Sequence, residues 1–192
     1  MKTKIVLLIA NLVLMSCSVM NNKKAENIKY RDLDLSAIDT NDFLIVKSQD
    51  VSGYETGSPF AFVNRKGDTV IPPGRYYATW TDTLKTFAIV SDKNLGLIGI
   101  DKEGNVLYKV FSFDNGPDFI NEGLFRVVRY GKIGYADRRG KIVIPCQFDC
   151  AYYFENGKAK VSKNCKKIKD FDHVKWESDS WYFIDKTGKK TE

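Results

Sequence analysis

The side chains with the greatest chemical potential are three cysteines and a histidine in the last third of the chain. Cys146, Cys150 and Cys165 precede His173, the only histidine. A thiolate with an imidazole can form a cysteine hydrolase, and the same atoms can bind zinc. Both kinds of site carry local signatures, and neither a C-x-x-C pair nor such a signature is present. We therefore expect neither a metal site nor a cysteine enzyme.

Serine and carboxylate chemistry is also poorly supported. A Ser-His-Asp system would have to use His173, which has no G-x-S-x-G turn nearby. Asp170 with Asp172, or Asp114 with Asp118, would supply the two carboxyl groups of a glycoside hydrolase. Beside glycine and proline, as in F-D-N-G-P-D, acidic residues are typical turn formers. We expect no catalytic residues and no cofactor.

The first seventeen residues differ in composition from the strands and turns that must position these side chains. MKTKIVLLIANLVLMSC begins with Lys2 and Lys4, continues through an apolar run and ends at Cys17. The run is too short to span a bilayer and has the three-part form of a secretory signal. Its end, L-M-S-C, resembles the lipobox of bacterial lipoproteins. The resemblance implies that residues 1–16 are a signal peptide and that Cys17 is a lipid anchor, with fatty-acyl chains such as palmitate.

An ordinary secretory signal, with Cys17 merely nearby, is the alternative. Residues 18–30, S-V-M-N-N-K-K-A-E-N-I-K-Y, are polar, rich in Asn and Lys, and lack apolar periodicity. This composition predicts a tether over residues 17–41 that lifts a folded domain, residues 42–192, off the membrane, and we expect folded structure to begin between Ile28 and Phe43. The expected location is the bacterial cell envelope, with the domain lipid-anchored to a membrane and facing the periplasm or the cell surface. A lipid anchor needs no transmembrane helix.

Composition indicates a single compact domain rich in strands. The chain has 192 residues, of which 43% are hydrophobic and 13% aromatic. Aromatic residues suit the half-buried surface of a sheet. The formal net charge is +6, but the basic residues are scattered, whereas a nucleic-acid groove gathers them on one face. We therefore expect no nucleic-acid partner.

A short pattern recurs four times and predicts hairpin tips. It reads Asp or Asn, then Lys or Arg, any residue, and Gly. The first side chain accepts hydrogen bonds from backbone N–H groups ahead of it, and the glycine takes the positive φ that closes the turn. The copies are F-V-N-R-K-G at 62–67, G-I-D-K-E-G at 99–104, Y-A-D-R-R-G at 135–140 and F-I-D-K-T-G at 183–188.

A second pattern lies between the tips and sets the period. T-F-A-I-V spans 86–90, G-L-F-R-V spans 123–127 and G-K-A-K-V spans 157–161. Tips and strands together recur after about 36 residues, which is typical of a repeat architecture. The sequence therefore predicts an all-β domain of tandem antiparallel β-hairpin repeats, in which stacked neighbours bury the apolar faces jointly.

These residues resemble the WG-repeat proteins of bacteria. The resemblance is strongest over residues 119–161, where F-I-N-E-G-L-F-R-V-V-R-Y-G-K-I-G-Y-A-D-R-R-G-K-I-V-I-P stands. Ile133 occupies the position of the tryptophan that names the family. The resemblance implies the repeat fold and carries no catalytic residues.

The period is interrupted near the C-terminus by roughly 14 extra residues. Residues 164–180 hold His173, Lys175 and Trp176. A solvated loop with Trp176 tucked onto the sheet is one interpretation. The other is a partner-binding loop, because an aromatic residue beside mixed charge is typical of interfaces. His173, Lys175 and Trp176 are the candidate partner-binding residues.

The cysteines are interpreted as one disulfide and one free thiol. Cys150 and Cys165 flank the turn at Asn156-Gly157. If this turn closes a hairpin, the two cysteines face one side, a diagonal step apart, and a bulge brings them to bonding distance. Disulfides persist outside the cytoplasm. We predict a Cys150–Cys165 bond, with Cys146 free.

The function expected from these features is non-enzymatic binding. A lipid-anchored repeat module would present its surface to an envelope or secreted protein. The first alternative is carbohydrate binding, because aromatic faces stack on sugars, and a glycan is therefore a further candidate partner. An envelope hydrolase is the weakest alternative. The aromatic residues that motivate carbohydrate binding are Tyr76, Tyr77, Trp80, Tyr152 and Tyr153.

Overall fold

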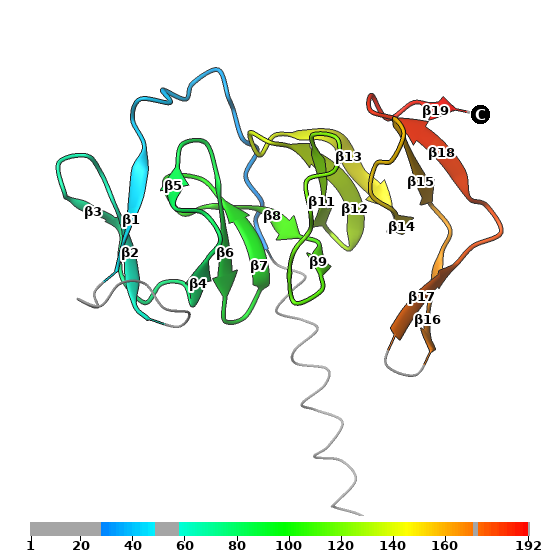
Figure 1. Ribbon diagram of the computed structural model, residues 1–192, viewed down its shortest axis with the longest axis horizontal. Helices are drawn as coiled ribbons and strands as arrows, with labels where there is room; N and C mark the ends of the chain where they lie inside the picture. The colour runs from blue at the N-terminus through cyan, green and yellow to red at the C-terminus, as the bar shows by residue number, and fades with distance from the viewer. Residues whose placement is uncertain (1–27, 49–57, 171–172, 192) are drawn as a thin grey trace, which may run out of the picture.

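The computed structural model describes residues 28–48, 58–170 and 173–191 (Figure 1). Within these residues it contains strands and turns but no helix, so the prediction of an all-β fold is confirmed. Cys17 and the predicted signal peptide lie outside the described part. In the part of the chain that is described, no helix has the length and apolarity needed to cross a bilayer.

Four units of three antiparallel strands follow one another across the molecule from left to right in Figure 1. In each unit the first strand pairs with the central strand, and the central strand pairs with the third. The strands are, by unit, β1 (Leu44–Ser48), β2 (Phe60–Val63) and β3 (Thr69–Ile71); β6 (Ala88–Asp92), β7 (Gly96–Ile100) and β8 (Val106–Val110); β11 (Leu124–Arg129), β12 (Lys132–Asp137) and β13 (Ile142–Phe148); β15 (Lys158–Ser162), β18 (Tyr182–Asp185) and β19 (Lys190–Thr191).

Two of the units share one sheet, and short strands in the connections extend the sheets or form a separate pair. Units 2 and 3 share a seven-stranded sheet because β8 pairs with β11, with Val110 opposite Val127. Units 1 and 4 each form the greater part of a four-stranded sheet. The connecting strands are β4 (Ala78–Thr79), β5 (Thr83–Leu84), β9 (Ser112–Phe113), β10 (Gly116–Pro117) and β14 (Cys150–Ala151).

The recurring tetrad forms the turn between the central and third strands of each unit. At the third tip, Asp137 Oδ1 accepts hydrogen bonds from the backbone N–H groups of Arg139 (2.9 Å) and Lys141 (3.0 Å). Gly140 takes φ +84° and closes the turn. Asn64, Asp101 and Asp185 make the same pair of hydrogen bonds at their own tips, as the sequence predicts.

The core consists of three layers, one between each pair of successive units. Alternate residues of each first strand face the preceding unit and the following unit, so inner units are buried on both faces. This joint burial is what the repeat pattern predicts. The layers are Leu44, Phe60 and Phe62 with Val90, Ile98 and Ile100; Leu107, Tyr108 and Val110 with Phe125, Val127 and Ala136; and Leu124, Tyr135 and Ile144 with Ala159, Val161 and Ile184.

The segment before the first unit contacts the repeats. The Tyr30 ring meets Tyr130 edge-on at 5.1 Å between centroids, and the backbone N–H of Arg31 donates to the carbonyl of Val106 at 2.9 Å. Asp32 pairs with Arg129 at 2.6 Å, and Leu33 packs on the layer between units 2 and 3. These contacts place residues 30–33 against the repeats, at the early end of the range, Ile28 to Phe43, in which folded structure is expected to begin.

Candidate functional site

The insertion at 164–180 forms a hairpin that projects from unit 4, at the lower right of Figure 1. Its strands are β16 (Lys166–Asp170) and β17 (His173–Glu177), paired with Lys167 opposite Trp176. The hairpin lies in the connection between the first and central strands of its unit. In unit 3 the same connection consists of Tyr130 and Gly131 alone.

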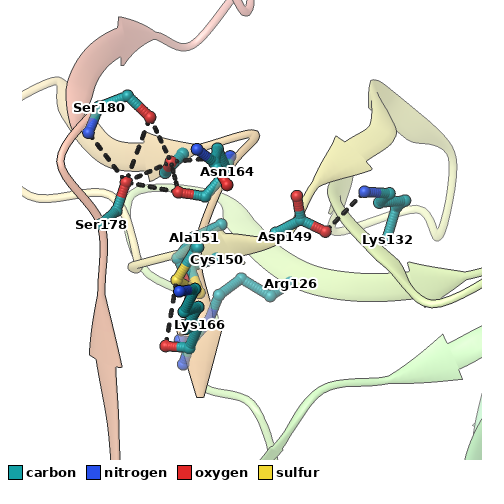
Figure 2. Close-up of a disulfide and its surroundings, with 11 residues drawn as sticks. Arg126, Lys132, Asp149, Cys150, Ala151, Asn164, Lys166, Ser178 and Ser180 are labelled. Carbon is teal, nitrogen blue, oxygen red and sulfur yellow. Dashed lines mark hydrogen bonds and ion pairs between the residues drawn. A yellow bond between two sulfur atoms is a disulfide. The ribbon is translucent and has the colours of Figure 1, made fainter. Parts of the chain in front are cut away.

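A disulfide and a group of hydroxyls fix the base of this hairpin (Figure 2). Cys150 of β14 is bonded to Cys165, with 5.9 Å between their Cα atoms, and this is the pair favoured from the sequence. Ser178 Oγ donates to the carbonyl of Asn164 at 2.6 Å and lies 2.8 Å from Ser162 Oγ. Both ends of the hairpin are thereby held against β14 and β15.

Trp176 attaches the hairpin to the body of the domain. Its half-buried ring meets Phe111 at 5.7 Å and Tyr152 at 5.3 Å, edge-on in both cases. Tyr152 in turn meets Trp181 at 5.5 Å. Such pairs stabilise by about 0.5–1.5 kcal/mol each beyond the area they bury. The ring of Trp176 is thus tucked onto the sheet.

Two of the three predicted partner-binding residues, Lys175 and Trp176, lie on different faces of the hairpin, because side chains alternate along a strand. Lys175 is exposed and lies opposite Ile168, and His173, two positions earlier in β17, lies opposite Asp170. The face with Lys175 also carries Lys166 and Ile168, and Ile168 is 39% exposed.

A buried ion pair that sequence reasoning missed joins units 2, 3 and 4. Arg126 Nη2 and Nε donate to the two oxygens of Asp118 at 2.5 and 2.9 Å, and both side chains are almost fully buried. Arg126 Nη1 donates to the carbonyl of Ala151 at 3.2 Å, and its guanidinium lies 4.0 Å from the centroid of Phe111. The interpretation of Asp118 as a turn former is wrong, because both oxygens of its carboxylate accept hydrogen bonds from Arg126.

Cys146 is the free thiol, as expected, and is half-buried in β13. Burial raises the pKa of this thiol above its ordinary value, so it is a poor nucleophile at neutral pH. Across the described residues, no three His, Cys, Asp or Glu side chains are grouped closely enough to hold a metal ion.

An exposed tryptophan borders a groove on unit 2. Trp80 is 51% exposed, and its indole N–H donates to Ser91 Oγ at 3.4 Å. The groove has a volume of about 420 Å³ and is also lined by Lys109, Ser112 and Asn115. It therefore places an aromatic face beside a cation, an amide and hydroxyl groups.

The disulfide should contribute measurably to stability. Removing both sulfurs in Cys150→Ala/Cys165→Ala should lower the free energy of unfolding by about 3 kcal/mol, because the bond closes a loop of 15 residues. Urea unfolding with and without reductant measures the effect. Cys146→Ala is the control and should change little. A reductant-sensitive double variant would contradict the pairing.

One segment of the chain matches a known protein family. Residues 133–166 match a family model described as a WG containing repeat. The match runs from β12 through the tip at Asp137 and the first strand of unit 4 to the base of the inserted hairpin. It supports a WG-repeat protein. Searches of curated proteins and of solved structures gave no match for the chain.

Proposed function

We propose that the protein is a non-enzymatic WG-repeat lipoprotein of the bacterial cell envelope, and that it presents a repeat surface to a protein partner. The inserted hairpin is the observation that carries this proposal. Its outer face, with Lys166, Ile168 and Lys175 exposed, takes no part in the stacking of the units. This face is therefore open to a partner, while the opposite face of the hairpin attaches to the domain through Trp176.

The hairpin is suited to binding because its base is fixed to the domain. The Cys150–Cys165 bond, the Ser162–Ser178 contact and the packing of Trp176 hold it before any partner arrives. Binding through a preorganised segment avoids the entropy cost of ordering it. An apolar side chain between two lysines offers burial at the centre of an interface and charge at its rim.

Site-specific photo-crosslinking tests this role directly. Ile168 and Val143 are each 39% exposed, but only Ile168 lies on the hairpin. A photoreactive residue at 168 should give a discrete protein adduct in intact cells, identifiable by mass spectrometry, whereas the same residue at 143 should not. Absence of an adduct at 168, or the same adduct at both positions, would contradict a partner on the hairpin.

The anchor has its own test. Cys17→Ala should move the protein from the membrane fraction to the soluble fraction, because it removes the cysteine that would carry the lipid, and the apolar run before it is too short to span a bilayer. The measurement is fractionation followed by a salt and carbonate wash. A variant that still sediments with membranes after both washes would show that Cys17 is not the anchor.

Carbohydrate binding is the second candidate, and the groove beside Trp80 favours it. Sugars stack on exposed aromatic faces and donate hydroxyl hydrogen bonds, which Ser91, Ser112 and Asn115 could accept at this groove. A glycan array decides the matter. A reproducible saccharide signal that Trp80→Ala removes would support this candidate, and a blank array would count against it.

A further inference from the structure

The outer face of unit 4 differs from the corresponding face of the inner units. In units 2 and 3 the positions that face the next unit hold Phe87, directly before β6, Ile89 and Leu124, which pack in the layer beyond. Arg126, the fourth such residue, is buried and paired with Asp118. The matching positions of β15 hold Lys158 and Lys160, which are exposed. The face that stacks elsewhere in the repeat is therefore open and cationic here.

Aromatic side chains surround these lysines. Tyr152, Tyr153 and Phe183 are 40%, 42% and 43% exposed. Phe183 lies directly opposite Lys160 in the pairing of β15 with β18, so the two side chains share one face. A pocket of about 260 Å³ lies among Tyr152, Tyr153, Glu155, Lys158, Lys160 and Phe183.

The central groups of this pocket are held in place. Lys160 Nζ lies 5.0 Å from the centroid of Trp181, and Trp181 contacts Tyr152 at 5.5 Å. The backbone N–H of Tyr152 donates to the carbonyl of Lys160 at 2.9 Å. The ammonium of Lys160 and the ring of Tyr152 therefore both contact Trp181, and the backbone pairs the two residues.

We propose that this pocket, the end pocket of unit 4, binds a saccharide that carries a carboxylate, a hexuronate unit. The exposed rings offer flat apolar surfaces to the C–H faces of the sugar, and Lys160 offers a charge-assisted hydrogen bond to the carboxylate. The carboxylate of Glu155 accepts hydrogen bonds from sugar hydroxyl groups. This assignment rests on the carbohydrate-binding candidate and is independent of the partner proposed for the hairpin.

A carboxylated sugar fits better than a neutral one because the pocket places a lysine between rings. A neutral saccharide would use the rings and Glu155 but would offer no carboxylate to the ammonium of Lys160. The pocket is open to solvent, and its volume, about 260 Å³, lies just below the usual range of small-ligand sites. It suits about one sugar ring rather than the broad contact of a protein.

Titration of the full-length lipidated protein in detergent micelles tests the assignment. The probes are oligogalacturonate and a neutral galacto-oligosaccharide of equal length. Oligogalacturonate should bind more tightly, and its advantage should shrink at high salt, because screening weakens exposed charge pairs. Lys160→Gln should weaken oligogalacturonate binding about tenfold or more, since it removes a hydrogen bond to a charged group, and should leave the neutral probe unaffected.

Matched variants separate the site from general effects. Tyr153→Ala should weaken binding of oligogalacturonate about five- to tenfold through loss of a stacking face. Tyr130→Ala, at a side chain 73% exposed on the β11–β12 turn, and the exposed Lys163→Gln should not. Thermal unfolding of each variant verifies that the fold is retained.

The outcomes distinguish this inference from the functions proposed above. Equal binding of both probes would overturn the hexuronate assignment and leave carbohydrate binding standing. Binding that survives Lys160→Gln and Tyr153→Ala would place the saccharide elsewhere and overturn the end pocket. Binding of neither probe would overturn the assignment, and an adduct at residue 168 would still support a protein partner.

Discussion

Asp118→Ala is expected to lower the free energy of unfolding by about 3–5 kcal/mol, because it leaves the guanidinium of Arg126 buried without a counter-ion. Asp118 accepts from the backbone N–H of Arg126 at 2.8 Å as well as from its side chain. The substitution therefore also leaves a buried backbone donor unsatisfied. Urea unfolding monitored by tryptophan fluorescence measures the loss.

The control for this prediction is a variant that removes both charges. Asp118→Leu/Arg126→Met should be less destabilised than Asp118→Ala, because a buried ion pair replaced by apolar groups of similar volume leaves no uncompensated charge. Asp179→Ala, at an exposed carboxylate, should change stability by less than about 0.5 kcal/mol. If Asp118→Ala behaves like Asp179→Ala, the ion pair is not a determinant of the fold.

The position of Arg126 explains why this pair matters beyond its own energy. In the repeat pattern its site is equivalent to Ile89 in unit 2 and Lys160 in unit 4. In unit 3 the side chain must lie between two connections, so it contacts Asp118 in one and the carbonyl of Ala151 in the other. The pair is a polar substitute for the apolar contact that Ile89 makes in its own layer.

The tips and the period could be predicted because their causes are local. Each tip depends on one Asp or Asn side chain and one glycine within four residues, as the hydrogen bonds of Asp137 and Asp185 show. The alternation that follows each tip then specifies which face is buried. Local turn chemistry and strand periodicity therefore gave the fold class.

Features that depend on contacts distant in sequence could not be predicted in the same way. Strand β1 lies far before the first tip in the sequence, so neither recurring pattern marks it as the first strand of unit 1. Tyr30 contacts Tyr130, and Arg31 contacts Val106, far along the chain in both cases. No pattern in the sequence indicates such long-range contacts. Polar composition alone suggested a tether.

The candidate site was predicted in part for the same reason. The insertion is visible as a break in the period, and the cysteine pair follows from hairpin geometry. Whether Trp176 packs or projects depends on Phe111 and Tyr152, which come from two other connections. The sequence alone therefore left both positions of Trp176 open, packed on the sheet or projecting into solvent. The end pocket could not be predicted from the sequence, because its existence depends on the outer face of β15 being left uncovered by other units.

The second large effect is expected at the third tip. Gly140→Val should lower the free energy of unfolding by about 3–4 kcal/mol, through the strain of a β-branched residue in the left-handed region together with overpacking. Gly140 has φ +84°, and a Cβ atom there would lie 2.4 Å from the ring of Phe87 in the preceding unit. Its carbonyl also accepts a hydrogen bond from the Tyr108 hydroxyl at 3.0 Å, so any shift of the tip disturbs the layer between units 2 and 3.

Two other glycines separate the causes of this effect. Gly67, at the first tip, has φ +90° but no atom within 4 Å of its Cβ position, so Gly67→Val should show the backbone strain alone, about 1–2 kcal/mol. Gly116 has no positive φ, and its Cβ position lies 3.6 Å from the ring of Trp80, an ordinary contact, so Gly116→Val should be the mildest of the three. The urea midpoint should be highest for Gly116→Val, lower for Gly67→Val and lowest for Gly140→Val. This order would show that the third tip is both a turn and a contact between units. Equal midpoints for Gly67→Val and Gly140→Val would mean that the tip does not press on Phe87, and the stacking of unit 3 on unit 2 would have to rest on the apolar strands alone.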